Sequence, residues 1–148
     1  MKMRIYLDNC CFNRPYDEQS QAKIKLETEA KQFIQDLVKI KEIELLWSYV
    51  LDFENSRNSS DEKRLSIQSW KELAIQNILE NEVVLTRMES LEELGFKSLD
   101  ALHIACAIEG NADIFLTTDN GILTRKNLVK EIRLMNPIHF FEERLDEN

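Results

Sequence analysis

Four carboxylates stand where a folded chain could bring them together. Asp8 and Asp119 each directly follow an apolar run, as a residue does at the end of a buried strand. Asp100 falls in the first turn of one expected helix, and Glu54 falls one to two turns into another. Like charges at close range repel and raise one another's pKa, so such a group needs a cation. Hard divalent ions such as Mg²⁺ and Mn²⁺ accept these oxygen ligands.

A divalent ion held in this way suits attack on a phosphate. It lowers the pKa of a bound water, orients that water, and offsets charge that develops on phosphate oxygens. The sequence contains only two histidines, no Gly-rich phosphate loop and no nucleophile elbow, so no comparable alternative chemistry is offered. The candidates for both catalysis and metal binding are Asp8, Glu54, Asp100 and Asp119.

The elements that must position these side chains alternate along the chain. Short apolar runs predict strands at residues 4–7, 44–47, 83–85, 114–117 and 132–135. Helical spacing and caps predict helices at residues 22–41, 49–54, 61–77, 88–94 and 99–108, with loops at 13–21 and 55–60. This alternation predicts a three-layer α/β/α sandwich with a mainly parallel sheet of about five strands. In such sheets ligands bind beyond the carboxyl ends of the strands.

Capping residues set the expected helix ends. Ser48 suits the N-cap of the helix that carries Glu54, and Ser98 suits the N-cap of the helix that carries Asp100. Asp61 is expected to cap a further helix. Gly95 stands where the C′ residue of a helix prefers glycine.

Each candidate also has a purely structural interpretation. Asp8 and Asp119 could cap helices or shape turns, and Asp100 could gain roughly 0.3–1 kcal/mol from the helix dipole. Asn9 and Thr118 could hydrogen-bond the carboxylates or simply be turn residues.

The helix after residue 48 presents two acidic residues on opposite sides. Asp52 and Glu54 are two positions apart, so only one of them can serve the site. Glu54 shares a face with Val50, which favours an inward side chain. His103 lies on an apolar helix beside Ile104, and we interpret it as a packed or partly exposed histidine rather than a ligand.

Composition bounds the class of protein. The 148 residues suit one domain spanning residues 1–148, and three Gly and two Pro argue against long linkers. The apolar start is too short for a signal peptide and no run approaches a membrane span. Three cysteines without a CxxC pair favour a reducing cytoplasm. The net charge of −8 argues against a surface that is basic throughout.

The ordered set of acidic motifs resembles the PIN domain. The resemblance is carried by an apolar strand ending in Asp8, by Glu54 on the second helix, by Asp100-Ala101-x-x-x-Ala105, and by Thr117-x-Asp119. It implies a Mg²⁺- or Mn²⁺-dependent nuclease, usually acting on RNA, with Asp8, Glu54, Asp100 and Asp119 as the metal-site residues. Many bacterial proteins similar to this are toxins of toxin–antitoxin pairs, which form homodimers and are inhibited by an antitoxin protein.

Two other functions remain open. A receiver or phosphotransfer domain needs an aspartate after the third strand and a lysine after the fifth, and neither expected position has one. A non-catalytic interaction module with a PIN-like fold would use the acidic surface to bind a basic partner. An RNA substrate would require a local basic rim, for which the candidates are Arg14, Arg57, Lys97, Arg125 and Lys126.

Overall fold

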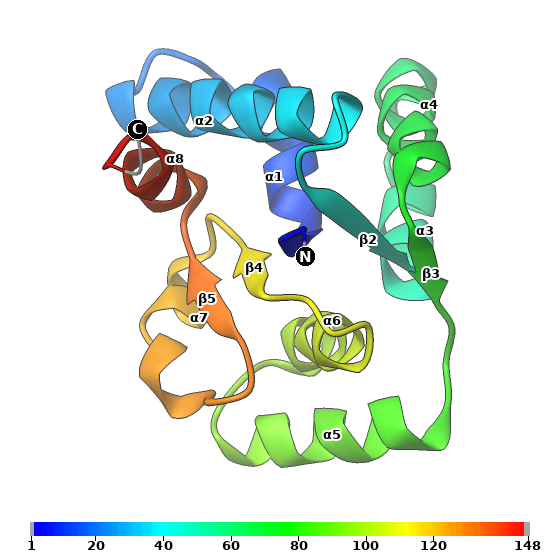
Figure 1. Ribbon diagram of the computed structural model, residues 1–148. Coiled ribbons are helices and arrows are strands. Elements are labelled where there is room, and N and C mark those ends of the chain that lie inside the picture. The colour runs from blue at the N-terminus through cyan, green and yellow to red at the C-terminus, as the bar shows by residue number, and fades with distance from the viewer. Residues whose placement is uncertain (1, 147–148) are drawn as a thin grey trace.

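Five parallel strands form one sheet at the centre of the protein (Figure 1). The structure is a computed structural model and describes residues 2–146. The strand order is β3-β2-β1-β4-β5, and all four pairings are parallel. The strands are β1 (Arg4–Leu7), β2 (Glu44–Ser48), β3 (Gln76–Ile78), β4 (Ile114–Leu116) and β5 (Arg133–Met135).

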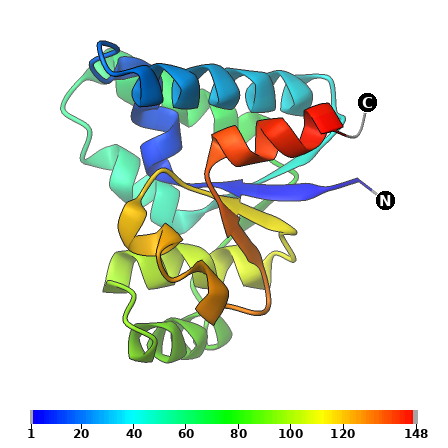
Figure 2. The same ribbon diagram turned by 90° about the vertical axis from the view of Figure 1, so that its left-hand side faces the viewer.

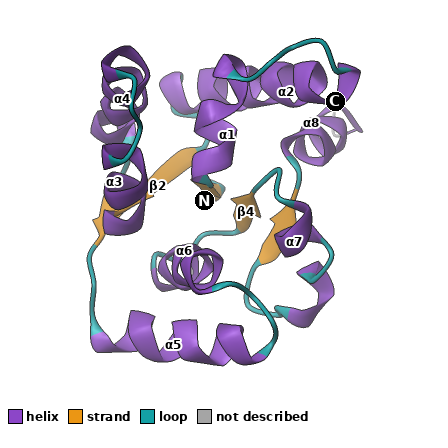
Figure 3. Ribbon diagram, turned by 180° about the vertical axis from the view of Figure 1, so that it is seen from behind, coloured by secondary structure: helices purple, strands orange, loops and turns teal. Residues whose placement is uncertain are grey.

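Helices cover both faces of the sheet, so the predicted α/β/α sandwich is confirmed (Figures 1 to 3). α2 and α8 lie over one face; α6 lies against the other, with α5 packed across it. The α-helices are α1 (Asn9–Asn13), α2 (Ala22–Lys39), α3 (Tyr49–Ser56), α4 (Asp61–Gln68), α5 (Glu82–Glu93), α6 (Ser98–Glu109), α7 (Asn120–Leu123) and α8 (Pro137–Asp146). Short 3₁₀ helices are η1 (Arg14–Tyr16), η2 (Ser69–Leu73) and η3 (Lys126–Leu128). No helix within residues 2–146 is long and apolar enough to cross a membrane.

β1 is the middle strand of the sheet, and its last three residues are apolar. Ile5, Tyr6 and Leu7 are at most 1% exposed, as expected for a strand covered on both faces. β1 pairs with β2 on one side and with β4 on the other. The carboxyl ends of these three strands therefore meet at one edge of the sheet.

The prediction of a third strand at residues 83–85 is wrong. These residues belong to α5, whose N-cap Asn81 accepts a hydrogen bond from the Val84 N–H at 2.9 Å. Val84 is buried whereas Val83 is 54% exposed, because a helix turns successive side chains toward different surroundings. The third strand is β3 at the sheet edge, where a helix reaching residue 77 was expected. α4 instead ends at Gln68.

The helix ends agree with the predicted caps in part. Ser48 caps α3 and Gly95 follows α5 with a φ of +101°, both as predicted. Ser60, rather than Asp61, caps α4. Ser98 is the first residue of α6 rather than its cap, and its hydroxyl donates to a Glu92 carboxylate oxygen at 2.6 Å.

α6 approaches the sheet closely because its buried face consists largely of small residues. Ala101 and Ala105 are fully buried, and Gly110 follows the helix. A Cβ atom on Gly110 would lie 2.5 Å from Leu46 Cδ1 and 3.0 Å from Ile78 Cδ1. The glycine is therefore required by packing and not by its backbone angles.

We expect Gly110→Ala to destabilise the protein by about 1–3 kcal/mol, because the added methyl group overpacks the α6–sheet contact. Thermal unfolding should show a fall in midpoint of roughly 2–10 °C. In a Leu46→Val background the cost should shrink, because the closest clashing atom is gone. An equal cost in both backgrounds would rule out this steric explanation.

Candidate metal centre

Asp8 lies at the carboxyl end of β1 and is 6% exposed. Its backbone N–H donates to the Leu116 carbonyl at 2.9 Å, which continues the pairing with β4. Its Oδ1 accepts from the Asn9 N–H at 2.8 Å and caps α1, a helix that forms where the sequence predicted none. Its Oδ2 accepts from the Thr117 hydroxyl at 2.8 Å and from the Cys10 thiol at 3.4 Å. The carboxylate is thus held in one orientation.

Glu54 and His103 complete a tight cluster around Asp8. Glu54 reaches the site from α3, and its Oε1 is hydrogen-bonded to Nε2 of His103 on α6. The same Nε2 lies 3.9 Å from Asp8 Oδ1. One ligand atom from each of the three residues lies within 4.8 Å of the others. This geometry could hold a metal ion.

The two acidic residues of α3 separate as their spacing requires. Glu54 faces the cluster, whereas Asp52 accepts hydrogen bonds from Trp47 Nε1 at 2.9 Å and from Lys71 Nζ at 3.0 Å. Partial burial raises the pKa of Asp52, but hydrogen bonds from Trp47, Gln68 and Lys71 outweigh it and leave the pKa below its usual range. Asp52 therefore ties α3 to the following segment.

Asp100 and Asp119 lie near this cluster without entering it. Burial, then the charges of Asp119 and Asp8, raise the pKa of Asp100 to about 6, although His103 and Lys97 act in the opposite direction. The charges of Asp119 and Asp8 disfavour ionised Asp100, as expected for carboxylates that lie near one another. Asp8, Asp100 and Asp119 therefore lie near one another at one edge of the sheet, and Glu54 joins Asp8 and His103 in the tight cluster.

Thr117 links two of these aspartates. Its hydroxyl donates to Asp8, and its Oγ1 accepts from the Asp119 N–H at 3.1 Å. Asp119 caps α7 by accepting from the Gly121 N–H at 2.8 Å. Thr117, and not Thr118, is thus the side chain that supports the carboxylates here.

The donor and acceptor balance of the site fits a cation. Asn9 donates through Nδ2 to Glu54 Oε2 at 3.3 Å, but its buried Oδ1 has no hydrogen-bond partner among the described residues. Buried acceptors normally find a donor. An unmatched oxygen beside grouped carboxylates is the environment that a hard divalent ion satisfies.

The interpretation of His103 as a packed residue is incomplete. It is buried, but both ring nitrogens have polar partners: Nε2 faces Glu54, and Nδ1 lies 2.6 Å from Tyr6 Oη. Its spacing of three residues from Asp100 places both on one face of α6, which was the available signal in the sequence. Tyr6 and Ser48, which back the histidine, carried no such signal.

Some of the basic residues that were expected to rim the site are engaged in other interactions. Arg14 is bound to Asp17 and Glu27, each at 2.9 Å, so it fixes η1 to α2. Lys97 is exposed and acts electrostatically on Asp100, which places it beside the site. Arg125 packs against Gly95 and donates to the Gly121 carbonyl at 2.9 Å.

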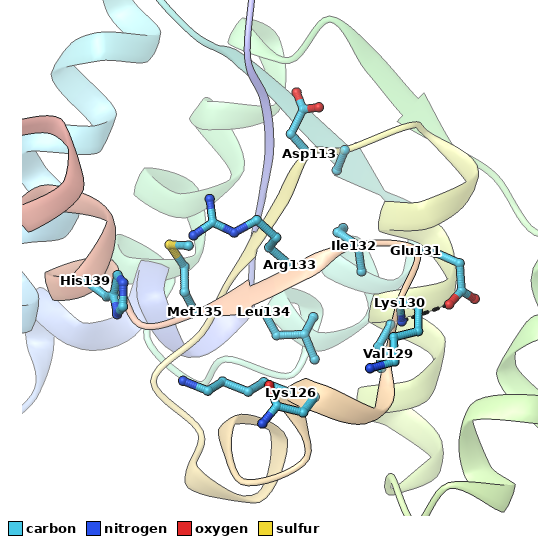
Figure 4. Close-up of a pocket in the computed structure, with 12 residues that line it drawn as sticks. Asp113, Lys126, Val129, Lys130, Glu131, Ile132, Arg133, Leu134, Met135 and His139 are labelled. Carbon is cyan, nitrogen blue, oxygen red and sulfur yellow. Dashed lines mark hydrogen bonds between the residues drawn. The ribbon is translucent and has the colours of Figure 1, made fainter. Parts of the chain in front are cut away.

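A separate cavity of about 480 Å³ runs along the edge strand β5 (Figure 4). Its lining mixes acidic and basic side chains, namely Asp113, Lys126, Lys130, Glu131, Arg133 and His139. None of the four candidate carboxylates lines it. Among the described residues, the candidate centre and this cavity are distinct.

Comparison with known proteins identifies the family of the chain. The sequence profile of the PIN domain matches residues 5–127, and the chain belongs to the PIN domain family. Its fold is similar to a chain in the crystal structure of VapBC2 from Rickettsia felis bound to a DNA fragment from their promoter. That match has a TM-score of 0.55 and 16% identity, and covers 90% of this chain and 98% of the other. No curated protein sequence matches the chain.

We expect Asp100→Asn to stabilise the metal-free protein at pH 7.5, raising its unfolding midpoint by roughly 2–5 °C. The folded pKa of about 6 exceeds the unfolded value of about 3.9, so ionised Asp100 destabilises the fold above pH 6. The rise in unfolding midpoint caused by Asp100→Asn should shrink as pH falls from 6 and vanish near pH 4.

Thermal unfolding in EDTA measures this effect, with the exposed Asp36→Asn on α2 as the control. Mn²⁺ should reverse the order by stabilising the parent more than the variant. A gain that did not depend on pH would contradict a charge effect at Asp100.

Proposed function

We propose that this protein is a metal-dependent endonuclease, and specifically an endoribonuclease. We propose Asp8, Glu54, Asp100 and Asp119 as its catalytic and metal-site residues, with Mg²⁺ or Mn²⁺ as the cofactor. The observation that carries the proposal is the contact of Asp8, Glu54 and His103 at the carboxyl end of β1. Membership of the PIN domain family supports the same activity.

We assign separate roles to the side chains around such a site. A bound divalent ion lowers the pKa of water and offsets the charge of a phosphate. Asp8 and Glu54 would hold it, and Thr117 and Asn9 keep these two carboxylates oriented. Asp100 and Asp119 would add negative charge beside the ion. This charge would favour a second set of ligands for the ion or a bound water. Lys97 is placed to attract a phosphate.

The first test is cleavage of labelled single-stranded RNA in Mg²⁺, Mn²⁺ or EDTA. We expect cleavage by the parent, none in EDTA, and a loss of about 100-fold or more in Asp100→Asn and Asp8→Asn. Asp36→Asn, which changes an exposed carboxylate on α2, should keep parental activity. Cleavage that survives both EDTA and the site variants would come from a contaminant and would overturn the proposal.

We further propose that the protein is the toxin of a toxin–antitoxin pair, that it acts in the cytoplasm as a homodimer, and that an antitoxin protein inhibits it. The similarity to a chain of the VapBC2 structure, which was solved with promoter DNA, supports a partner of this kind. A small protein with a basic DNA-binding start, encoded beside this gene, is the expected partner.

Coexpression tests this second proposal. Induced alone in a bacterial host, the parent chain should arrest growth while Asp100→Asn should not. The neighbouring gene product should restore growth, copurify with both chains and suppress RNA cleavage. Growth arrest by Asp100→Asn equal to that of the parent would contradict a nuclease toxin.

A non-catalytic interaction module is the alternative, and metal binding separates it from an enzyme. Calorimetric titration with Mg²⁺ and Mn²⁺ should show binding by the parent. Metal binding without cleavage of single-stranded RNA would point to a structured or specific substrate. No metal binding at all would leave the interaction module as the better description.

A further inference from the structure

His103 occupies a position that packing alone does not explain. The side chain is 1% exposed and presents Nε2 to two carboxylates, Glu54 and Asp8. Its other nitrogen is engaged from behind by Tyr6 Oη at 2.6 Å, and Tyr6 Oη lies 2.6 Å from Ser48 Oγ. An imidazole with one nitrogen directed into an oxygen-rich site and the other hydrogen-bonded behind it has the arrangement of a metal-bound histidine.

The hydroxyl pair behind His103 permits two arrangements of the same protons. Tyr6 is fully buried, and its neutral phenol has one proton to donate. Ser48 Oγ already accepts from the Leu51 N–H at 3.2 Å, which leaves its own proton free to rotate. Tyr6 can therefore donate to His103 and accept from Ser48, or accept from His103 and donate to Ser48.

Each arrangement selects one tautomer of His103. When Tyr6 donates to Nδ1, the ring proton is on Nε2 and is donated to Glu54. When Nδ1–H donates to Tyr6, the lone pair of Nε2 faces Glu54 and Asp8. That second arrangement is repulsive without a cation and favourable with one. Both arrangements carry the same number of protons.

On the basis of the metal-dependent function proposed above, we propose that His103 is itself a ligand of the divalent cation through Nε2. The site is then a mixed nitrogen–oxygen site with Asp8 and Glu54, and Tyr6 and Ser48 stabilise the Nδ1–H tautomer. The unmatched Asn9 Oδ1 beside Glu54 is independent support for a cation there.

A nitrogen ligand changes which metal the site prefers. Carboxylates suit Mg²⁺ and Mn²⁺ alike, whereas imidazole favours transition metals, in the order Mn²⁺ below Co²⁺. We expect Co²⁺ and Mn²⁺ to bind more tightly than Mg²⁺. Replacing His103 by Gln should weaken Co²⁺ binding by about tenfold or more and Mg²⁺ binding much less. Tyr6→Phe should weaken Co²⁺ and Mn²⁺ by about tenfold, because Nδ1–H loses its acceptor.

The deciding experiment is pulsed electron paramagnetic resonance of the full chain with one equivalent of Mn²⁺. A nitrogen bound directly to Mn²⁺ gives a ¹⁴N coupling, which ¹⁵N-histidine labelling of the wild-type protein should convert to the ¹⁵N pattern. The coupling should persist in His139→Gln, which replaces the other histidine in the sequence, and should disappear in His103→Gln. The labelled wild type and His139→Gln together decide the question even if His103→Gln does not fold.

The outcomes separate the ligand from the proposed function. Bound Mn²⁺ without nitrogen coupling would overturn the assignment and leave His103 as a residue that positions Glu54; RNA cleavage could then still stand. Nitrogen coupling without RNA cleavage would keep the metal ligand and contradict the nuclease. A coupling that disappears in His139→Gln would place the metal at α8 and would also overturn the assignment.

Discussion

The pairing of β1 with both β2 and β4 is the constraint on which the site depends. It buries Tyr6 and aligns the ends of three strands, so that Asp8, Ser48 and Thr117 emerge at one edge. Each residue of that edge then supports another: Thr117 orients Asp8, and Ser48 contacts Tyr6 while capping α3. The same capping sets the direction in which α3 carries Glu54 toward the cluster. A change in strand register by one residue would turn these side chains to the other face of the sheet, and the site residues would no longer meet.

The site concentrates negative charge in a chain that is already acidic, with a net charge of −8. Burial and two neighbouring carboxylates disfavour the ionised form of Asp100, so the metal-free fold is less stable than its packing alone would allow. A bound cation removes that repulsion and returns stability by linkage. An acidic surface also repels nucleic acid at a distance, so recognition of RNA would depend on the cation and on the few basic residues nearby, such as Lys97.

Much of the fold could be predicted from the sequence, because buried parallel strands must be apolar throughout. β4 is apolar throughout, and β1, β2 and β5 are apolar apart from end residues such as Arg4, Glu44 and Arg133. β3 departs from the rule, since an edge strand needs few buried residues: Gln76 and Asn77 are exposed. The run 83–85 looked like a strand only because its residues are apolar. Of the site, Asp8 and Asp119 were expected from strand ends, and Asp100 and Glu54 from positions on helices. The contacts that His103 on α6 makes come from β1 and α3. Only tertiary packing brings such contacts together.

The structural and functional interpretations of the aspartates are compatible. Asp8 caps α1 through Oδ1, and Asp119 caps α7 through Oδ1, so each carboxylate uses one oxygen to satisfy a helix end. An ionised carboxylate has about four acceptor positions, and a cap occupies one of them. Capping also fixes the carboxylate at low entropic cost before any ligand arrives, since the helix has already ordered it. The feature that makes these residues look like ordinary caps is therefore the feature that would preorganise them for a cation.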